Sequence, residues 1–103
     1  MSEYVSIKAD VLQKLTRHLP EIRERFGIQT FGIFGSVARG EDTPDSDVDI
    51  FYRFQPDKYS YDTFLDFSDY LENLLNRRIE LVSLESMPER FRLAAEPDMI
   101  PVQ

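Results

Sequence analysis

Two short runs of residues in the sequence could together do chemistry on a phosphate. The first is Gly35-Ser36, and the second, after ten intervening residues, is Asp47-Val48-Asp49. Side chains alternate faces along a strand, so we expect Asp47 and Asp49 to point the same way and to lie close together. Two like charges held together are unfavourable unless something neutralises them. A hard divalent cation bound through carboxylate oxygens, chiefly Mg²⁺, meets that need.

The Gly35-Ser36 pair supplies the complementary feature, a place for the phosphate itself. Gly35 has no side chain, so the backbone there can approach a phosphate closely. Ser36 stands where a short helix is expected to begin and offers a hydroxyl and free backbone N–H groups to an anion. A phosphate-binding turn followed by a pair of carboxylates is typical of proteins that carry out Mg²⁺-dependent chemistry on triphosphates. Arg39 has two open roles: it contacts phosphate, or it ties the following loop through Asp42 or Asp45.

The elements that must position these residues are predicted from hydrophobic periodicity. Apolar residues at helical spacing from Ile7 to Ile22 indicate one amphipathic helix, or two segments that meet near Pro20, and Gly27 is a natural stop. Three runs are rich in β-forming residues, and each is bounded by turn residues or alternates between apolar and polar positions. These runs predict strands at 29–34, 47–54 and 79–82.

The remaining segments complete an α/β order. Residues 36–40 are predicted to form a helical turn, 41–46 a loop and 61–75 a second long helix. We expect the positive charges of Arg77-Arg78 to end this helix and to interact favourably with the negative end of its dipole. Ser86 with Glu89 resembles a capping box that opens a last helix through about Ala95. The sequence therefore predicts an α/β fold with a small sheet, and 103 residues is the length of a single domain, 1–103.

Composition narrows the classes of function. The chain has no cysteine and one histidine, His18, which excludes disulfides and thiolate metal sites and disfavours a Ser-His-Asp triad. The net charge is +2 over residues 1–40 and −9 over residues 41–103, so the chain lacks the basic footprint of a nucleic-acid binder. No apolar run approaches the length of a membrane span, and we expect a cytoplasmic protein with no direct membrane contact.

Aromatic residues are concentrated in one segment. Seven of them lie between residues 51 and 67, which is more than one small core face can bury. Some of this apolar surface is therefore expected to meet a partner.

The two chemical runs together resemble a known family. Residues 34–40, Phe-Gly-Ser-Val-Ala-Arg-Gly, and residues 46–50, Ser-Asp-Val-Asp-Ile, resemble the DNA polymerase β type of nucleotidyltransferase. The chain looks most like the minimal nucleotidyltransferases (MNT) that are encoded beside HEPN proteins as antitoxins. The family carries a third carboxylate on a later strand, usually an aspartate, and here Glu80 stands at the matching place in Ile79-Glu80-Leu81-Val82.

The resemblance implies a fold, an activity and a partner. The fold is a small mixed sheet flanked by helices. The activity is transfer of AMP from ATP to a tyrosine hydroxyl of a HEPN ribonuclease toxin, in a hetero-oligomer with that toxin. The resemblance implies that Asp47, Asp49 and Glu80 are catalytic and bind two Mg²⁺ ions. It implies that Gly35, Ser36 and Arg39 bind the nucleotide. Glu80 is the candidate proton acceptor.

Two other functions stay open at this point. A non-catalytic antitoxin would use the same fold only to cover its toxin, and the longer Glu80 side chain in place of aspartate is compatible with it. A nucleotidyltransferase acting on tRNA or a small molecule is disfavoured by the acidic charge and by the lack of a second, acceptor-holding domain in these 103 residues.

Overall fold

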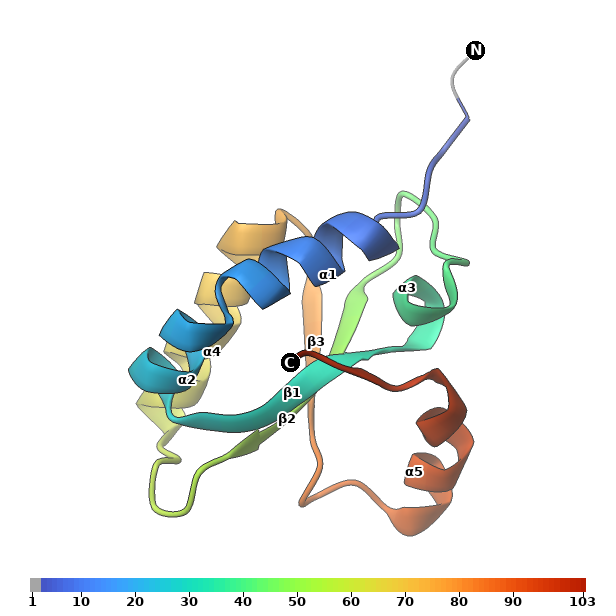
Figure 1. Cartoon of the computed structure of the whole chain (residues 1–103). Helices are drawn as coiled ribbons and strands as arrows, with labels where there is room; N and C mark the ends of the chain where they lie inside the picture. Colours follow the sequence, from blue (N-terminus) through green and yellow to red (C-terminus); the bar gives the residue numbers. More distant parts are fainter. Residues whose placement is uncertain (1–2) are drawn as a thin grey trace.

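The computed structural model of the chain describes residues 3–103 and has the predicted α/β order (Figure 1). Its helices are α1 (Lys8–Arg17), α2 (Leu19–Phe26), α3 (Gly35–Arg39), α4 (Tyr61–Leu75), α5 (Glu89–Ala95) and the short 3₁₀ helix η1 (Glu96–Asp98). Its strands are β1 (Ile28–Phe34), β2 (Val48–Phe54), β3 (Ile79–Ser83) and β4 (Ile100–Pro101). The three predicted strands and the long helix α4 are confirmed.

The four strands form one mixed sheet in the order β3-β2-β1-β4. Strand β1 pairs antiparallel with both β2 and β4, whereas β2 and β3 are parallel. A parallel pair needs a crossover connection, and α4 provides it. The register places Asp49 of β2 directly beside Glu80 of β3.

The N-terminal helical region is two helices, which confirms one of the two predicted alternatives. Helix α1 ends at Arg17 and α2 begins at Leu19, with His18 between them. Pro20 falls in the first turn of α2, where its missing N–H costs no helical hydrogen bond. Gly27 ends α2 in the left-handed conformation, with φ of 67°, as its position predicted.

The start of the last helix differs from the prediction. Helix α5 begins at Glu89 after Pro88, and no side chain caps it, so the capping box of Ser86 and Glu89 is wrong. A residue that precedes proline is disfavoured from helical conformation, which keeps Met87 out of the helix. Met87 is instead buried against Phe34 and Phe51. Helix η1 and the two-residue strand β4 were not predicted, because neither carries a periodic pattern.

The two faces of the sheet are covered very differently. Helices α1, α2 and α4 lie on one side of the sheet and α5 on the other (Figure 1). The side under α1, α2 and α4 holds a cluster of eighteen buried residues, including Val48, Ile50 and Phe67. The side under α5 holds a cluster of three, Phe34, Phe51 and Met87. Because β2 alternates, its Asp49 belongs to the thinly covered side, with Phe51.

Among residues 3–103, no helix is long and apolar enough to cross a bilayer. Cellular location and the single-domain assignment stay predictions. Of the clustered aromatics, Phe51, Tyr52, Phe54 and Phe67 are buried, whereas Tyr59 and Tyr61 are 60% and 66% exposed. The expected surplus of exposed aromatic surface is therefore present at the start of α4.

Candidate active site

Two carboxylates from neighbouring strands meet on the thinly covered face of the sheet. Asp49 of β2 and Glu80 of β3 are paired positions in a parallel ladder, so their side chains leave the sheet side by side. Asp49 is half-buried and Glu80 is exposed. The pairing of strands far apart in the sequence thus brings together two of the three predicted carboxylates.

The proximity of these like charges changes the titration of Asp49. Burial raises the pKa of Asp49, and the neighbouring Glu80 raises it further, both by hydrogen bonding to the protonated form and by repulsion of the charged one. Repulsion from Asp47 adds to this, Arg39 opposes it, and the pKa of Asp49 stands at about 6. A half-buried carboxylate beside a second one is a donor set that suits a hard divalent cation, since the cation relieves the repulsion.

Gly35 lies directly against the Asp49 carboxylate. Its φ is +75°, in the left-handed region, and a Cβ placed on it would lie 2.2 Å from Oδ2 of Asp49. Both the backbone turn from β1 into α3 and the space beside Asp49 therefore require glycine. Within the chain, the Gly35 backbone approaches the carboxylate of Asp49, and its approach to a phosphate stays a prediction.

The cavity beside this pair holds four of the six predicted site residues. It has a volume of about 390 Å³, and its lining includes Gly35, Arg39, Asp49 and Glu80. Ser36 and Asp47 lie outside that lining. Four further lining residues come from the C-terminal segment: Phe91, Ala94, Ala95 and Asp98. Sequence patterns do not predict them, because α5 and η1 reach the site only through the tertiary fold.

Asp47 is half-buried and its carboxylate faces Arg78, with 3.5 Å between its Oδ1 and the Arg78 Nε. Among residues 3–103, no three histidine or acidic side chains are arranged to enclose a metal ion. Asp49 and Glu80 lie together in the cavity, and the metal-binding roles of all three carboxylates stay predictions. Arg78 is 83% exposed at its side chain, so its ion pair with Asp47 is readily exchanged for another partner.

Arg39 ties the site to the C-terminal segment and also contacts the first residue of the loop that follows it. Its guanidinium donates to Asp98 Oδ2 at 3.0 Å and lies 3.5 Å from Glu41 Oε1. The alternative partners considered for it, Asp42 and Asp45, are therefore wrong, although the choice between structural and phosphate-binding roles stays open. Arg39 lines the cavity with part of its side chain exposed.

Asp42 has a structural role away from the cavity. It is 6% exposed and accepts hydrogen bonds from the Tyr4 and Ser6 hydroxyls and, at 3.1 Å, from the backbone N–H of Ile7. Burial by itself would raise the pKa of Asp42, but these donors outweigh burial and lower it below its ordinary value. Asp42 anchors the N-terminal segment to the loop that precedes Asp47.

Arg77 holds that loop from the other side. Helix α4 ends at Leu75, so the expectation that Arg77 completes the helix end is wrong. Its Nη2 donates to the carbonyl oxygens of Thr43 at 2.8 Å and Ser46 at 2.7 Å. The loop leading to Asp47 is therefore fixed between Asp42 and Arg77.

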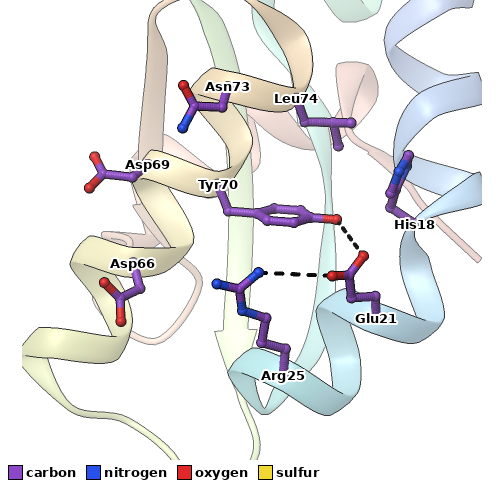
Figure 2. Close-up of a pocket in the computed structure, with 8 residues that line it drawn as sticks. All are labelled: His18, Glu21, Arg25, Asp66, Asp69, Tyr70, Asn73 and Leu74. Atoms are coloured by element: carbon purple, nitrogen blue, oxygen red, sulfur yellow. Dashed lines mark hydrogen bonds and ion pairs between the residues drawn. The ribbon is translucent and has the colours of Figure 1, made fainter.

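A larger cavity lies elsewhere and contains none of the predicted site residues. Figure 2 shows it beside α2 and α4, with a volume of about 510 Å³. Tyr70 donates to Glu21 at 3.0 Å there, and burial together with Glu21 raises the pKa of Tyr70 to about 12. His18 also lines this cavity, with its Nδ1 2.9 Å from the Lys14 carbonyl oxygen. The smaller cavity, with its paired carboxylates, has the chemistry of an active site.

Comparison with known proteins identifies the family of the chain. The family model described as polymerase beta nucleotidyltransferase matches residues 13–97. The protein adenylyltransferase MntA of Thermococcus cleftensis is 47% identical over 73 residues, which are 71% of this chain and 73% of that protein. The chain therefore belongs to the polymerase β nucleotidyltransferase family, and the expected enzyme class, nucleotidyltransferase, is confirmed.

Solved structures agree on the fold. A candidate minimal nucleotidyltransferase superposes with a TM-score of 0.75 at 29% identity, covering 89% of this chain and 93% of that one. A toxin–antitoxin structure with AMP-PNP matches with a TM-score of 0.64 at 17% identity, covering 85% of this chain and 72% of that one. At that identity the second likeness concerns the fold alone.

Proposed function

We propose that this chain is a protein adenylyltransferase that transfers AMP from ATP to a tyrosine hydroxyl of a HEPN toxin and thereby acts as its antitoxin. The observation that carries the proposal is the pairing of Asp49 with Glu80 against Gly35 in one cavity. The names of its relatives support protein as the acceptor, since MntA is described as a protein adenylyltransferase.

Magnesium fits the carboxylates of this site. Asp49 and Glu80 supply adjacent oxygen donors, and we assign Asp47, which follows the loop fixed by Arg77, as the third ligand. Bound Mg²⁺ would supply neutralisation of phosphate charge and a lowered pKa of an attacking hydroxyl. The pKa of Asp49 is raised first by burial and in part by repulsion from Glu80 and Asp47, and a bound cation would remove that repulsion.

The side chains of the cavity have distinct parts in the transfer. Glu80, exposed at its edge, accepts the proton of the tyrosine hydroxyl. The tyrosine oxygen forms a bond to the α-phosphorus of ATP while the bond to the β-phosphate oxygen breaks, and pyrophosphate leaves with that electron pair. Gly35 lines the cavity and Ser36 follows it just outside the lining, and we assign their backbone N–H groups and the Ser36 hydroxyl to the phosphates. Arg39, which also lines the cavity, adds a positive charge.

The toxin partner is supported by the family resemblance and by surface composition. The fold is shared with a toxin–antitoxin structure, which is compatible with assembly into a hetero-oligomer. Exposed Tyr59 and Tyr61 are apolar surface of the kind that protein partners cover.

The test is intact mass spectrometry of the toxin encoded beside this protein, after incubation with ATP and Mg²⁺. Wild type is expected to add an AMP-sized group to the toxin, and Asp49→Asn to lose about 10²-fold or more of the rate while still binding the toxin. Asp57→Asn, which removes the same charge from an exposed turn outside the cavity, is the matched control and should retain activity.

The outcome that would overturn the enzymatic proposal is equally definite. If the toxin's mass stays unchanged with wild type, yet wild type and Asp49→Asn both block toxicity, the protein neutralises its toxin by binding alone.

A further inference from the structure

We propose that the apolar half of the 390 Å³ cavity, centred on Phe91 of α5, is the subsite for the nucleobase of the nucleoside triphosphate. This inference rests on the proposed function, since it assumes that the paired carboxylates receive a metal-bound triphosphate. It adds the recognition of the base, which the carboxylates and Gly35 cannot provide.

The cavity lining contains two kinds of residue, as a nucleotide contains a charged tail and a flat base. The first part of the lining is charged and consists of Arg39, Asp49, Glu80 and Asp98. The second part is apolar and consists of Phe34 and Val82 of the sheet together with Phe91, Ala94 and Ala95 of α5. A triphosphate suits the first part and a flat aromatic base the second, and the volume lies in the range typical of small-molecule sites, ~300–1,000 Å³.

Phe91 is held in place without being a core residue. Its ring meets the Phe34 ring at 90°, with 6.1 Å between centroids, which fixes its orientation. It nevertheless stays 44% exposed, and none of the residues Glu89–Ala95 that form α5 is buried. An oriented but uncovered aromatic ring in a cavity is a stacking surface for a base.

The chain offers a matched comparison on the same helix. Leu93 is 61% exposed, more than Phe91, but lies outside the cavity lining. If exposed apolar surface on α5 mattered only for packing or for protein contact, truncating Leu93 and Phe91 would have similar effects on nucleotide affinity. If Phe91 stacks on the base, only its truncation would weaken nucleotide binding.

The experiment is isothermal titration calorimetry with two probes, ATP and inorganic tripolyphosphate, each with Mg²⁺. Tripolyphosphate has the charge of the nucleotide tail and no base. We expect Phe91→Ala to weaken ATP binding by about tenfold or more and to leave tripolyphosphate affinity unchanged. Phe91→Trp should restore ATP affinity, and Leu93→Ala should bind both probes like wild type.

The failures of this inference and of the proposed function are distinguishable. The base subsite would be overturned if Phe91→Ala kept its ATP affinity, or if it lost affinity equally for ATP and tripolyphosphate. Binding of both probes by wild type would still support the phosphate site in that case. Wild type that binds neither probe would overturn the proposed function and the subsite together. Circular dichroism of Phe91→Ala checks that α5 and the fold are intact, and Phe91→Trp tests the subsite if they are not.

Discussion

The two faces of the sheet differ in what they bury and in what they can do. The face under α1, α2 and α4 is a closed hydrophobic cluster whose β2 side chains are Val48, Ile50, Tyr52 and Phe54. The opposite face has three buried residues, an uncovered helix and the like-charged pair of Asp49 and Glu80. The same strands thus supply apolar residues to one side and carboxylates to the other, by alternation alone.

The two faces therefore have different roles: one stabilises the fold, and the other carries the reactive side chains. Holding Asp49 beside Glu80 is unfavourable, and the free energy that offsets it comes from burial on the other face, at roughly 25 cal/mol per Å² of apolar surface removed from water. The thin covering of the second face leaves a cavity in which a ligand can reach both carboxylates. Substitutions on the two faces should therefore separate unfolding from ligand binding.

The largest expected effect is on the closed face. Phe67 is fully buried and its ring lies within 6.4 Å, centroid to centroid, of the rings of Phe26, Phe31, Tyr52 and Phe54. We expect Phe67→Ala to lower the free energy of unfolding by about 3–5 kcal/mol, measured by urea denaturation. Leu65→Ala, at an exposed position on the same helix, is expected to stay within about 0.5 kcal/mol of wild type. Equal losses for the two variants would contradict the comparison.

A smaller effect on stability, with a selective effect on binding, is expected where β1 turns into α3. Gly35 and Gly40 have nearly the same φ, +75° and +72°, so alanine at either position should cost about 1–2 kcal/mol of backbone strain. A Cβ at Gly35 would meet Asp49, whereas at Gly40 it would meet no described atom within 4 Å. Calorimetry with ATP and Mg²⁺ should therefore show weakened binding for Gly35→Ala only. Parallel losses of affinity would mean that the contact with Asp49 is unimportant.

The smallest effect is expected in the dependence of stability on pH. The pKa of Asp49 is about 6 in the folded chain, above the ordinary value of an aspartate, so the folded state binds this proton more tightly than the unfolded state. In metal-free buffer, the free energy of unfolding of wild type should therefore rise relative to that of Asp49→Asn as the pH falls from above 6 to about 4. Denaturation of both proteins across that range measures the difference. A constant difference would show that folding does not raise the pKa of Asp49.

Most of the candidate site followed from local sequence patterns. The alternation of β2 placed Asp49 on the face away from the main core, and the Gly35 turn at the end of β1 was visible from the residue itself. Glu80 was placed by the family resemblance and by the predicted third strand, whose pairing with β2 the structure confirms.

Other predictions failed where a long-range contact decided the outcome. One of the two roles expected for Arg39 pairs it with Asp42 or Asp45, but its partners are Glu41 and Asp98, and Asp98 lies 59 residues further along the chain. Arg77 was assigned to a helix end, but it donates to carbonyls of the loop before Asp47. Pairings of this kind carry no periodicity, so a sequence pattern cannot find them.

The sequence by itself determined the elements, the face on which the carboxylates lie and the class of chemistry, because strand alternation, proline and glycine act over a few residues. Only the tertiary structure decided which side chains complete the cavity. Helix α5 crosses to the thin face after a connection that no local signal orients, and it brings Phe91 and, through η1, Asp98 to the carboxylates. The free energy that places it comes from burial of Phe34, Phe51 and Met87, residues that meet only once the chain has folded.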